Sequence, residues 1–351
     1  MSHRTMTRDP IPALDEAAMT AARQRQSRLT KPPGSLGRLE ELSVQLAGIT
    51  GRSMPVLREK AVVVMAADHG VTAEGVSAYP AEVTAQMVMN FLAGGAAINA
   101  LARQAGARVV VVDMGVAAPV ESNPGLLDRK IAHGTGNIAR GPAMAREQAE
   151  AAVAVGQDLM KDLAQQGVDL VGLGDMGIGN TTTASALTAA LTGVKVPTVV
   201  GRGTGVDDAG LARKMAVVER ALAVNRPDPS DPMGTLAKVG GFEIAGLVGV
   251  VLGAAASRVP VLVDGFITAA ASLVAARLEP EVRPYLIASH RSVEVGHRVI
   301  LDELGLEPLL ELELRLGEGT GAALAMHIIE AATRILAEMA TFEDAGVSDR
   351  A

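Results

Sequence analysis

The sequence contains no cysteine and no tryptophan, and aromatic residues make up only 2% of its 351 residues. Without cysteine, disulfides, thiolate metal ligands and cysteine nucleophiles are excluded. With so few aromatic rings, a planar ligand must be held largely by aliphatic side chains and methionine. The lack of cysteine also fits a reducing compartment, so we expect a cytoplasmic protein.

Basic runs and long apolar stretches are absent as well. A net charge of −7 and a pI near 5.5 provide no basic patch for nucleic acid or an anionic membrane. The longest uncharged apolar stretch, Ile244–Ser257, is too short to cross a bilayer and predicts a buried core helix. The opening MSHRTMTRDP lacks the apolar core of a secretory signal. We therefore expect neither a nucleic-acid partner nor a membrane span.

The length suggests one large domain, or a main domain with a smaller partner. Continuously apolar, β-branched runs alternate with helical patterns, which is typical of an α/β fold with a mostly parallel sheet and helices on both faces. The predicted strands are residues 61–65, 108–113, 168–173, 196–200, 259–264 and 284–288, and the intervening helices include 142–166, 207–224 and 265–277. Ligands of such sheets bind at the carboxyl ends of the strands.

Helices are also predicted at both ends of the chain, over residues 14–29 and 36–49 and again from 321 to about 340. Because they lie outside the strand region, they can pack together as a small helical domain. We therefore divide the chain into residues 1–55, the N-terminal part of the small domain, a large α/β domain at 56–312, and residues 313–351, which carry the loop around Glu318 and the helix that returns to the small domain.

The segment VDLVGLGDMGIGNTTT at 168–183 is the richest in functional signals. Its glycines allow close backbone approach to a ligand, and Asn180 and Thr181 stand at a predicted helix start, where free N–H groups favour a phosphate. The alternative is an ordinary glycine turn with a helix cap. Residues 172–177 also match GxGxxG, but the next predicted strand ends in Gly201-Arg202 without the ribose-binding acid, which disfavours a dehydrogenase.

Glu318, within LRLGEGTG at 314–321, stands between glycines just before a helix. Small neighbours leave its carboxylate open to a ligand, and the helix dipole favours its ionised form; the alternative is a stabilising first-turn glutamate. Asp68-His69 invites a metal or acid–base interpretation, but the six histidines are scattered. We predict no metal, and place His69 at the rim of the site or behind it.

Two weaker polar segments follow predicted strands. GRGTGVDDAGLARK at 201–214 brings Arg202 and Lys214, and the segment from Ser289 to Ser292 precedes Gly296-His297. Either could contact a phosphate or ribose, and either could be plain surface.

Taken together and in order, these segments resemble the nicotinate-nucleotide:dimethylbenzimidazole phosphoribosyltransferase family. The resemblance spans about Leu14 to Met339. The matching segments are KPPGSLGRLE at 31–40, AADHGV at 66–71, GDMGIGNTTT at 174–183, GRGTGVDDAGLARK at 201–214, VDGFITAAA at 263–271 and LRLGEGTGAALAM at 314–326.

The resemblance implies a homodimer with a Rossmann-like large domain and a small helical domain drawn from both chain ends. It implies transfer of the 5-phosphoribosyl group from nicotinate mononucleotide to 5,6-dimethylbenzimidazole, with no cofactor. The chemistry suits the residues: nicotinate leaves from a pyridinium without a general acid, and one carboxylate can accept the azole proton.

The resemblance also implies a role for particular residues. Glu318 falls on the family's general base. Phosphate or ribose contacts are expected from Asp175, Gly177, Ile178, Gly179, Asn180, Thr181, Arg202, Gly203, Lys214 and Ser292, and benzimidazole contacts from Tyr79, Gln86, Met87 and Leu316. Many members carry Glu where this chain has Asp175, so the shorter acid reaches less far toward a ligand.

Three alternatives to this interpretation stay open. The enzyme could act on a different acceptor base such as adenine, the chain could be a nucleotide-binding regulatory module with a structural Glu318, or it could be the disfavoured dehydrogenase.

Overall fold

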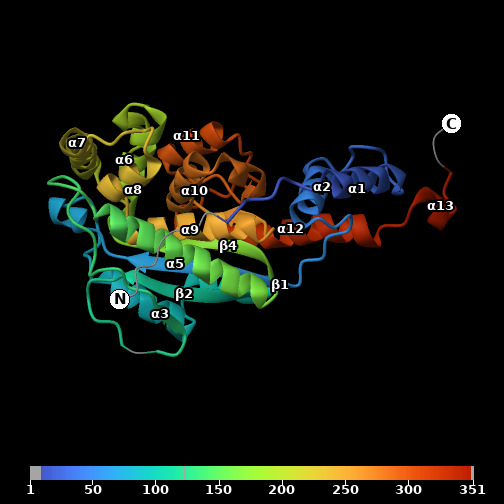
Figure 1. Ribbon diagram of the computed structural model, residues 1–351, viewed down its shortest axis with the longest axis horizontal. Helices are drawn as coiled ribbons and strands as arrows, with labels where there is room; N and C mark the ends of the chain where they lie inside the picture. Colours follow the sequence, from blue (N-terminus) through green and yellow to red (C-terminus); the bar gives the residue numbers. More distant parts are fainter. Residues whose placement is uncertain (1–8, 122, 349–351) are drawn as a thin grey trace.

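The computed structural model describes residues 9–121 and 123–348, and its centre is a six-stranded sheet with the order β3-β2-β1-β4-β5-β6 (Figure 1). All neighbouring strands are parallel. The strands are β1 (Glu59–Ala67), β2 (Ala107–Gly115), β3 (Leu126–Asp128), β4 (Val168–Met176), β5 (Val261–Val263) and β6 (Leu286–Ala288). The chain runs outward in one direction from β1 and in the other from β4, so the strand order reverses between them. Ligand crevices form at such a point.

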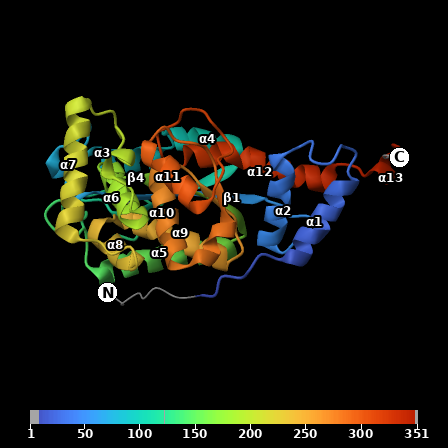
Figure 2. The same ribbon diagram turned by 90° about the horizontal axis from the view of Figure 1, so that it is seen from above.

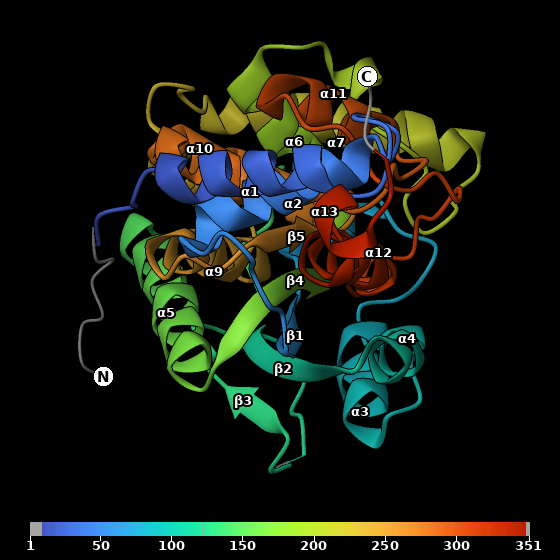
Figure 3. The same cartoon turned by 90° about the vertical axis from the view of Figure 1, so that its right-hand side faces the viewer.

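Apolar residues on both sides of each strand explain why the sheet is buried. In β1, Val63 and Met65 pack into one core, while Val62 and Val64 pack into another. Helices must therefore cover both faces of the sheet. In an all-parallel sheet, the helices that connect successive strands do this. Figure 3 shows the twisted sheet between these two layers.

The helices that pack on the two faces come from different parts of the chain. One face is covered by α5 (Arg146–Gln165), α9 (Phe242–Ala256) and α10 (Phe266–Leu278), and the other by α3 (Val83–Ala93), α4 (Ala97–Ala105) and α12 (Thr320–Glu338). The remaining elements of the large body are η1 (Gly70–Glu74), α6 (Asn180–Thr192), η2 (Val196–Thr198), α7 (Asp208–Asn225), α8 (Pro232–Val239), η3 (Pro280–Tyr285) and α11 (Val295–Leu304). The α/β prediction is confirmed.

A group of helices projects from the sheet at the right of Figures 1 and 2. It contains α1 (Glu16–Arg28), α2 (Arg38–Thr50), the end of α12 and α13 (Phe342–Ala345). The Arg25 side chain donates to the carbonyl oxygens of Leu336, Ala337 and Met339, which ties α1 to the end of α12. Helices from the N-terminal and C-terminal parts of the chain therefore lie side by side. Their status as a separate domain, with the boundaries given above, stays a prediction.

One predicted strand is wrong, and one strand was not predicted. Residues Val196–Val200 begin with the 3₁₀ turn η2, in which Pro197 supplies no N–H for a ladder. The missed strand, β3, has only three residues and extends the sheet beyond β2. The predicted core helix at Ile244–Ser257 is present as α9 and is buried almost throughout.

By length and composition alone, one described segment, Val83–Ala105, could cross a membrane. In the fold it is divided: α3 ends at Gly94, which adopts a left-handed conformation, and α4 begins at Ala97.

The helices α5 and α9 make backbone contact through glycines, and this contact yields a prediction. A β-carbon at Gly156 would lie 1.9 Å from the Gly246 carbonyl oxygen. Alanine normally favours a helix over glycine, yet we expect Gly156→Ala to lower the free energy of unfolding by about 3 kcal/mol, at the upper end of the usual cost of overpacking.

Urea denaturation measures this free energy, and Gly141→Ala is the control. A β-carbon at Gly141 would have no neighbour within 4 Å, so that change should stay within about 0.5 kcal/mol. Equal stability of the two variants would contradict the close contact.

Candidate active site

A cavity of about 300 Å³ opens at the carboxyl end of β4, beside the point where the strand order reverses. Six separate segments of the chain meet around it. Its lining residues are Tyr79, Asp175, Met176, Gly177, Ile178, Asn180, Thr181, Gly203, Thr204, Gly265, Phe266, Ile267, His290, Ser292, Glu294, Arg315, Leu316 and Gly317. The lining draws on four of the segments that the sequence singled out, at 174–183, 201–214, 263–271 and 314–326, whereas Asp68 and His69 do not line the cavity.

The glycine-rich loop between β4 and α6 packs against His69, which explains why it needs glycines. A β-carbon at Gly177 would lie 2.5 Å from the Ala67 carbonyl oxygen, and one at Gly179 would lie 3.3 Å from the His69 Cβ. Gly179 also has a φ of +96°, a left-handed value that favours glycine. The loop ends in the first turn of α6, so N–H groups converge on the cavity.

His69 is buried behind this loop, as the second of the two predicted placements has it. Its Nε2 lies 2.7 Å from Glu243 Oε1, and its Nδ1 lies 3.0 Å from the Thr183 hydroxyl. These contacts connect the end of β1 to α9 and α6. They hold His69, against which the glycine-rich loop packs, in place.

A buried cation, Lys214, lies next to the first turn of α6. Lys214 is fully buried, and its Nζ donates to Thr181 Oγ1 at 2.8 Å and to the Gly201 carbonyl oxygen at 3.1 Å. Burial lowers the pKa of Lys214 to about 8, while nearby Glu294 raises it. Glu294 also accepts the Gly203 N–H at 2.9 Å. The cation is therefore held directly behind two cavity-lining residues, Thr181 and Gly203.

Several acidic side chains lie near Asp175, which lines the cavity. Burial, and then the charges of Asp264, Glu243 and Glu318, hold the pKa of Asp175 well above its usual range, although a bond from Asn180 opposes the shift. The Asn180 side chain donates to Asp175 Oδ2 at 2.9 Å. Such crowding of like charges is a common feature of functional sites.

Glu318 lies at the junction of the 309–319 loop and α12, and it is only 5% exposed. Its Oε2 accepts the Ile98 N–H at the start of α4 at 3.3 Å. Burial raises the pKa of Glu318, and the bond from Ile98 partly opposes this. Its neighbours Leu316 and Gly317 line the cavity, whereas the Glu318 side chain lies beside it, toward α4.

Nine of the fifteen predicted site residues line the cavity. Gly179, Lys214 and Glu318 lie directly behind or beside it, and three others, Arg202, Gln86 and Met87, lie away from it. Arg202 donates to the Val206 carbonyl oxygen and pairs with Asp208 on the surface. Gln86 is exposed on α3, and Met87 is partly buried against the second core. Tyr79 and Leu316 stand at the rim, with exposed fractions of 56% and 57%.

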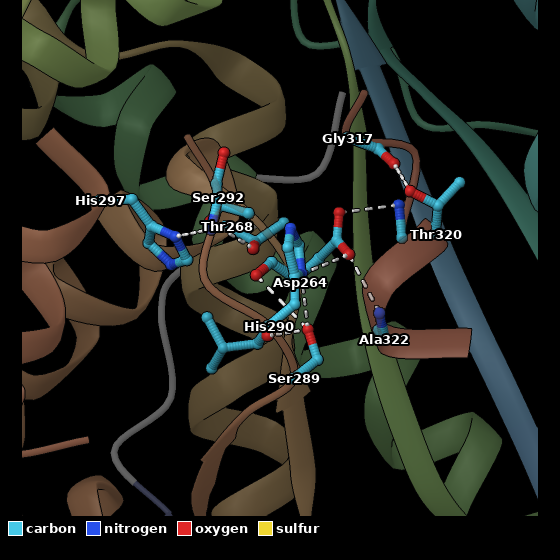
Figure 4. Close-up of polar contacts among 12 residues, drawn as sticks. Asp264, Thr268, Ser289, His290, Ser292, His297, Gly317, Thr320 and Ala322 are labelled. Carbon is cyan, nitrogen blue, oxygen red and sulfur yellow. Dashed lines mark hydrogen bonds and ion pairs between the residues drawn. The ribbon is translucent and has the colours of Figure 1, made fainter. Parts of the chain in front are cut away.

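Ser292 lines the cavity, and its backbone is held by a histidine. The Ser292 N–H donates to His297 Nδ1 at 3.0 Å (Figure 4). Burial lowers the pKa of His297 to about 3 and that of neighbouring His290 to about 4. Both rings are therefore neutral near neutral pH, and they order the loop without adding charge.

Several lining residues were not predicted from the sequence. Glu294 is the most important, because it fixes both Gly203 and the charge environment of Lys214. Phe266, Ile267 and Thr204 add apolar and hydroxyl surface. The only sequence feature that could have indicated these residues is their position, shortly after the end of a predicted strand or within a glycine-rich loop.

Two further features bear on what the molecule can bind. Among residues 9–121 and 123–348, no three histidine, aspartate or glutamate side chains are grouped to hold a metal ion. A second, mostly apolar cavity of about 490 Å³ lies between α1 and α2, and shares no lining residue with the first.

Comparison with known proteins first defines the class. A family model described as a phosphoribosyltransferase matches residues 11–347. Crystal structures of proteins from Thermus thermophilus have the same fold. One, titled CobT, superposes with a TM-score of 0.92 at 52% identity, over 95% of this chain and all of that one. Another, titled a nicotinate-nucleotide-dimethylbenzimidazole phosphoribosyltransferase, gives 0.91 at 50% identity, over 96% of this chain and all of that one.

Curated relatives then give the particular family. A protein of Chloroflexus aggregans is 60% identical over 350 residues, which is 100% of this chain and 99% of the relative. A protein of Roseiflexus is 62% identical over 340 residues, which is 97% of this chain and 96% of the relative. Both are named nicotinate-nucleotide–dimethylbenzimidazole phosphoribosyltransferase. This chain belongs to that family, as its motifs predicted.

The buried cation predicts how phosphate affinity depends on pH. Protonated Lys214 favours a bound phosphate, and its pKa is about 8, so affinity for ribose 5-phosphate should fall as the pH rises above 8. Loss of a charge-assisted hydrogen bond is worth roughly 10- to 100-fold in affinity, so we expect that loss, and a flatter pH dependence, in Lys214→Met.

Isothermal titration calorimetry from pH 7 to 9.5 measures both effects. Lys195→Met is the control, because Lys195 is exposed. An affinity that stays unchanged in Lys214→Met at pH 7 would contradict a role for this cation in phosphate binding.

Proposed function

We propose that this chain transfers the 5-phosphoribosyl group of nicotinate mononucleotide to 5,6-dimethylbenzimidazole, giving α-ribazole 5′-phosphate and nicotinate. One observation carries the proposal: a single cavity has a glycine loop and helix start at one side and the Glu318 loop at the other. The close similarity to relatives named for this reaction supports it. Nicotinate mononucleotide and dimethylbenzimidazole are then its two substrates.

The donor's phosphate would bind at the start of α6. The Ile178 N–H is already donated to the Thr84 hydroxyl, and the Asn180 N–H to the Gly177 carbonyl oxygen. This leaves the N–H groups of Gly177, Gly179 and Thr181 as the loop's candidate donors. Ile178 and Asn180 would shape the loop, and the α6 dipole adds to the attraction of a phosphate.

Ribose contacts would come from the groups next to this loop. Lys214 stands behind Thr181 and Gly203, and Ser292 also lines the cavity. Asp175 Oδ1 has no hydrogen-bond partner among the described residues, so it is placed to accept a sugar hydroxyl or to hold a proton. Arg202 would need to leave Asp208 to take part.

The transfer needs one proton to be removed. The bond from C1′ to the nicotinate nitrogen breaks, and its electron pair neutralises the pyridinium as nicotinate leaves. One benzimidazole nitrogen forms the new bond to C1′, while the N–H proton of the other passes to the Glu318 carboxylate. The raised pKa of Glu318 makes it a stronger base than an exposed glutamate. Attack opposite the leaving group converts the β donor into an α product.

The acceptor ring would lie between Leu316 and the α3 segment. Leu316 is exposed at the rim two residues from Glu318, and Tyr79 borders the same opening. Met87, on α3, packs into the core that also contains the first turns of α12. Leu316 and Tyr79 would contact an apolar bicyclic ring at the rim. Gln86 and Met87 lie outside the cavity lining and would have to approach the ring.

We also propose that the protein acts as a homodimer in the cytoplasm. The support for the cytoplasm is the lack of cysteine. The support for the homodimer is the open, mostly apolar cavity between α1 and α2, lined in part by Leu14, Met19 and Val44. A second copy of the chain would cover this surface.

Incubation of the protein with nicotinate mononucleotide and a panel of bases tests the reaction. Dimethylbenzimidazole should give α-ribazole 5′-phosphate and one equivalent of nicotinate, identified by mass spectrometry. Preferred use of adenine would instead establish the alternative acceptor. Binding without nicotinate release would indicate a regulatory module.

The placement of the acceptor yields a prediction for Leu316. A charged side chain at the apolar wall should oppose an apolar ring, so Leu316→Asp should raise KM for dimethylbenzimidazole by roughly 10-fold or more, the cost of losing apolar burial. KM for nicotinate mononucleotide should change little. Leu312→Asp is the control, because Leu312 is similarly exposed but does not line the cavity. An unchanged KM for the base in Leu316→Asp would refute this placement.

Glu318→Gln tests the general base. Glutamine keeps the size of the side chain and still accepts the Ile98 N–H, but it cannot take up a proton. We expect kcat to fall by roughly 10²- to 10⁴-fold, the usual worth of general-base assistance. Nicotinate mononucleotide should still bind, because its phosphate is held by the α6 loop.

Steady-state kinetics and thermal melting of Glu318→Gln separate catalysis from structure. A purely structural glutamate would show the opposite pattern, with a lower melting temperature and near-normal turnover. A rate above about half the normal value would remove Glu318 from the mechanism.

A further inference from the structure

Three consecutive residues around Glu318 adopt the left-handed backbone conformation. The φ angles are +82° at Gly317, +62° at Glu318 and +89° at Gly319. Glycine adopts this conformation readily, whereas a residue with a side chain does so at a cost and stays there only where its surroundings hold it. Something in the fold must therefore hold the backbone of Glu318.

The chain around Glu318 is packed closely against the sheet. A β-carbon at Gly174, in β4, would lie 2.5 Å from the Glu318 carbonyl oxygen, and one at Gly319 would lie 2.5 Å from Val62 Cγ1. This packing blocks one side of the loop. It supplies no partner for the free N–H groups at the start of α12, and Gly319, the N-cap residue, has no side chain that could do so.

Asp264, at the end of β5, supplies that partner. Its Oδ2 accepts the Gly319 N–H at 3.2 Å, and its Oδ1 accepts the Ala322 N–H at 3.0 Å (Figure 4). The Gly319 N–H belongs to the same peptide plane as the Glu318 carbonyl group. Bonds to that plane and to the next turn therefore fix the direction in which the Glu318 side chain leaves the backbone.

The environment of Asp264 fits a capping role more closely than an ion pair. Asp264 is fully buried, and the nearest described cation candidate, His290 Nδ1, is 3.8 Å away. Burial lowers the pKa of His290 to about 4, so that ring is neutral near neutral pH. Burial raises the pKa of Asp264 to about 7, and backbone N–H groups, those of Ala322 and Gly319 among them, oppose the rise.

We propose that Asp264 is a positioning residue for the reaction: it caps α12 from a neighbouring strand and thereby holds Glu318 in its left-handed, reactive placement. The proposal rests on the proposed role of Glu318 as the general base. Asp264 itself need not contact either substrate. A carboxylate is required because two N–H groups, three residues apart, each need an acceptor oxygen.

Asp264→Asn is the direct test, because it keeps one acceptor oxygen and turns an N–H group toward one of the two donors. Displacement of a catalytic group by about 1 Å typically costs roughly 100-fold in rate, so we expect kcat to fall by about 10- to 100-fold. KM for nicotinate mononucleotide should stay within about threefold of the normal value, since the α6 loop is untouched. If this variant does not fold, Asp264→Ser, which keeps one acceptor, receives the same measurements.

Asp113→Asn is the matched control. Asp113 is also buried at a strand end, and it accepts the N–H groups of Gly115 and Val116 at 3.0 and 2.9 Å, away from Glu318. We expect it to lower the melting temperature and to leave kcat of the folded enzyme near normal. The same pattern in Asp264→Asn would make Asp264 merely structural and overturn the proposal.

The double variant Asp264→Asn/Glu318→Gln separates the proposal from the proposed function. If Asp264 acts through Glu318, the double variant should turn over no more slowly than Glu318→Gln alone, because the base is already lost. A further tenfold fall would show that Asp264 acts elsewhere and contradict the positioning role. Normal turnover in Glu318→Gln would overturn the general base and the proposal together, whereas an inactive Glu318→Gln with a normal Asp264→Asn would overturn the positioning role alone.

Discussion

The close approach of the 317–322 segment to β4 is the constraint on which the site depends. It is possible because β4 carries glycine at positions 172 and 174, where a β-carbon would lie 3.0 Å from the Ala322 Cβ and 2.5 Å from the Glu318 carbonyl oxygen. Strand β4 therefore leads into the glycine-rich loop before α6, and it also packs against the loop that carries Glu318, the candidate base. One strand fixes both halves of the site, so the distance between them is set by the sheet and not by flexible loops.

Charge is arranged around this strand in a consistent way. Lys214 stands behind the loop at the start of α6, whereas Asp175, Asp264 and Glu318 lie below and beside the cavity. In the proposed reaction, the first position would favour a dianionic phosphate, and an ionised Glu318 would favour the positive charge that develops at C1′. Burial strengthens both effects, because screening by water is weak there.

Local patterns allowed the long strands, most helices and the glycine loops to be predicted, because each depends on residues close together in the sequence. Val196–Val200 failed because a β-branched run has the same pattern in a strand and in a packed turn, and only Pro197 argued against a strand. Interactions across long separations could not be predicted. The Asp264 bond to Gly319 spans 55 residues, and the Glu294 bond to Gly203 spans 91. Arg202 was expected at the end of a strand, but it follows the turn η2 instead and pairs with Asp208, which the sequence did not indicate.

The proposed reaction is a single displacement at C1′, with the phosphate held on one side of the cavity and the azole activated on the other. The anomeric configuration of the product tests this most directly. Nuclear magnetic resonance of the nucleotide formed from nicotinate mononucleotide and dimethylbenzimidazole should show only the α-anomer, the result of one inversion. A β-anomer would require retention, hence two displacements or a different binding geometry, and would contradict the account.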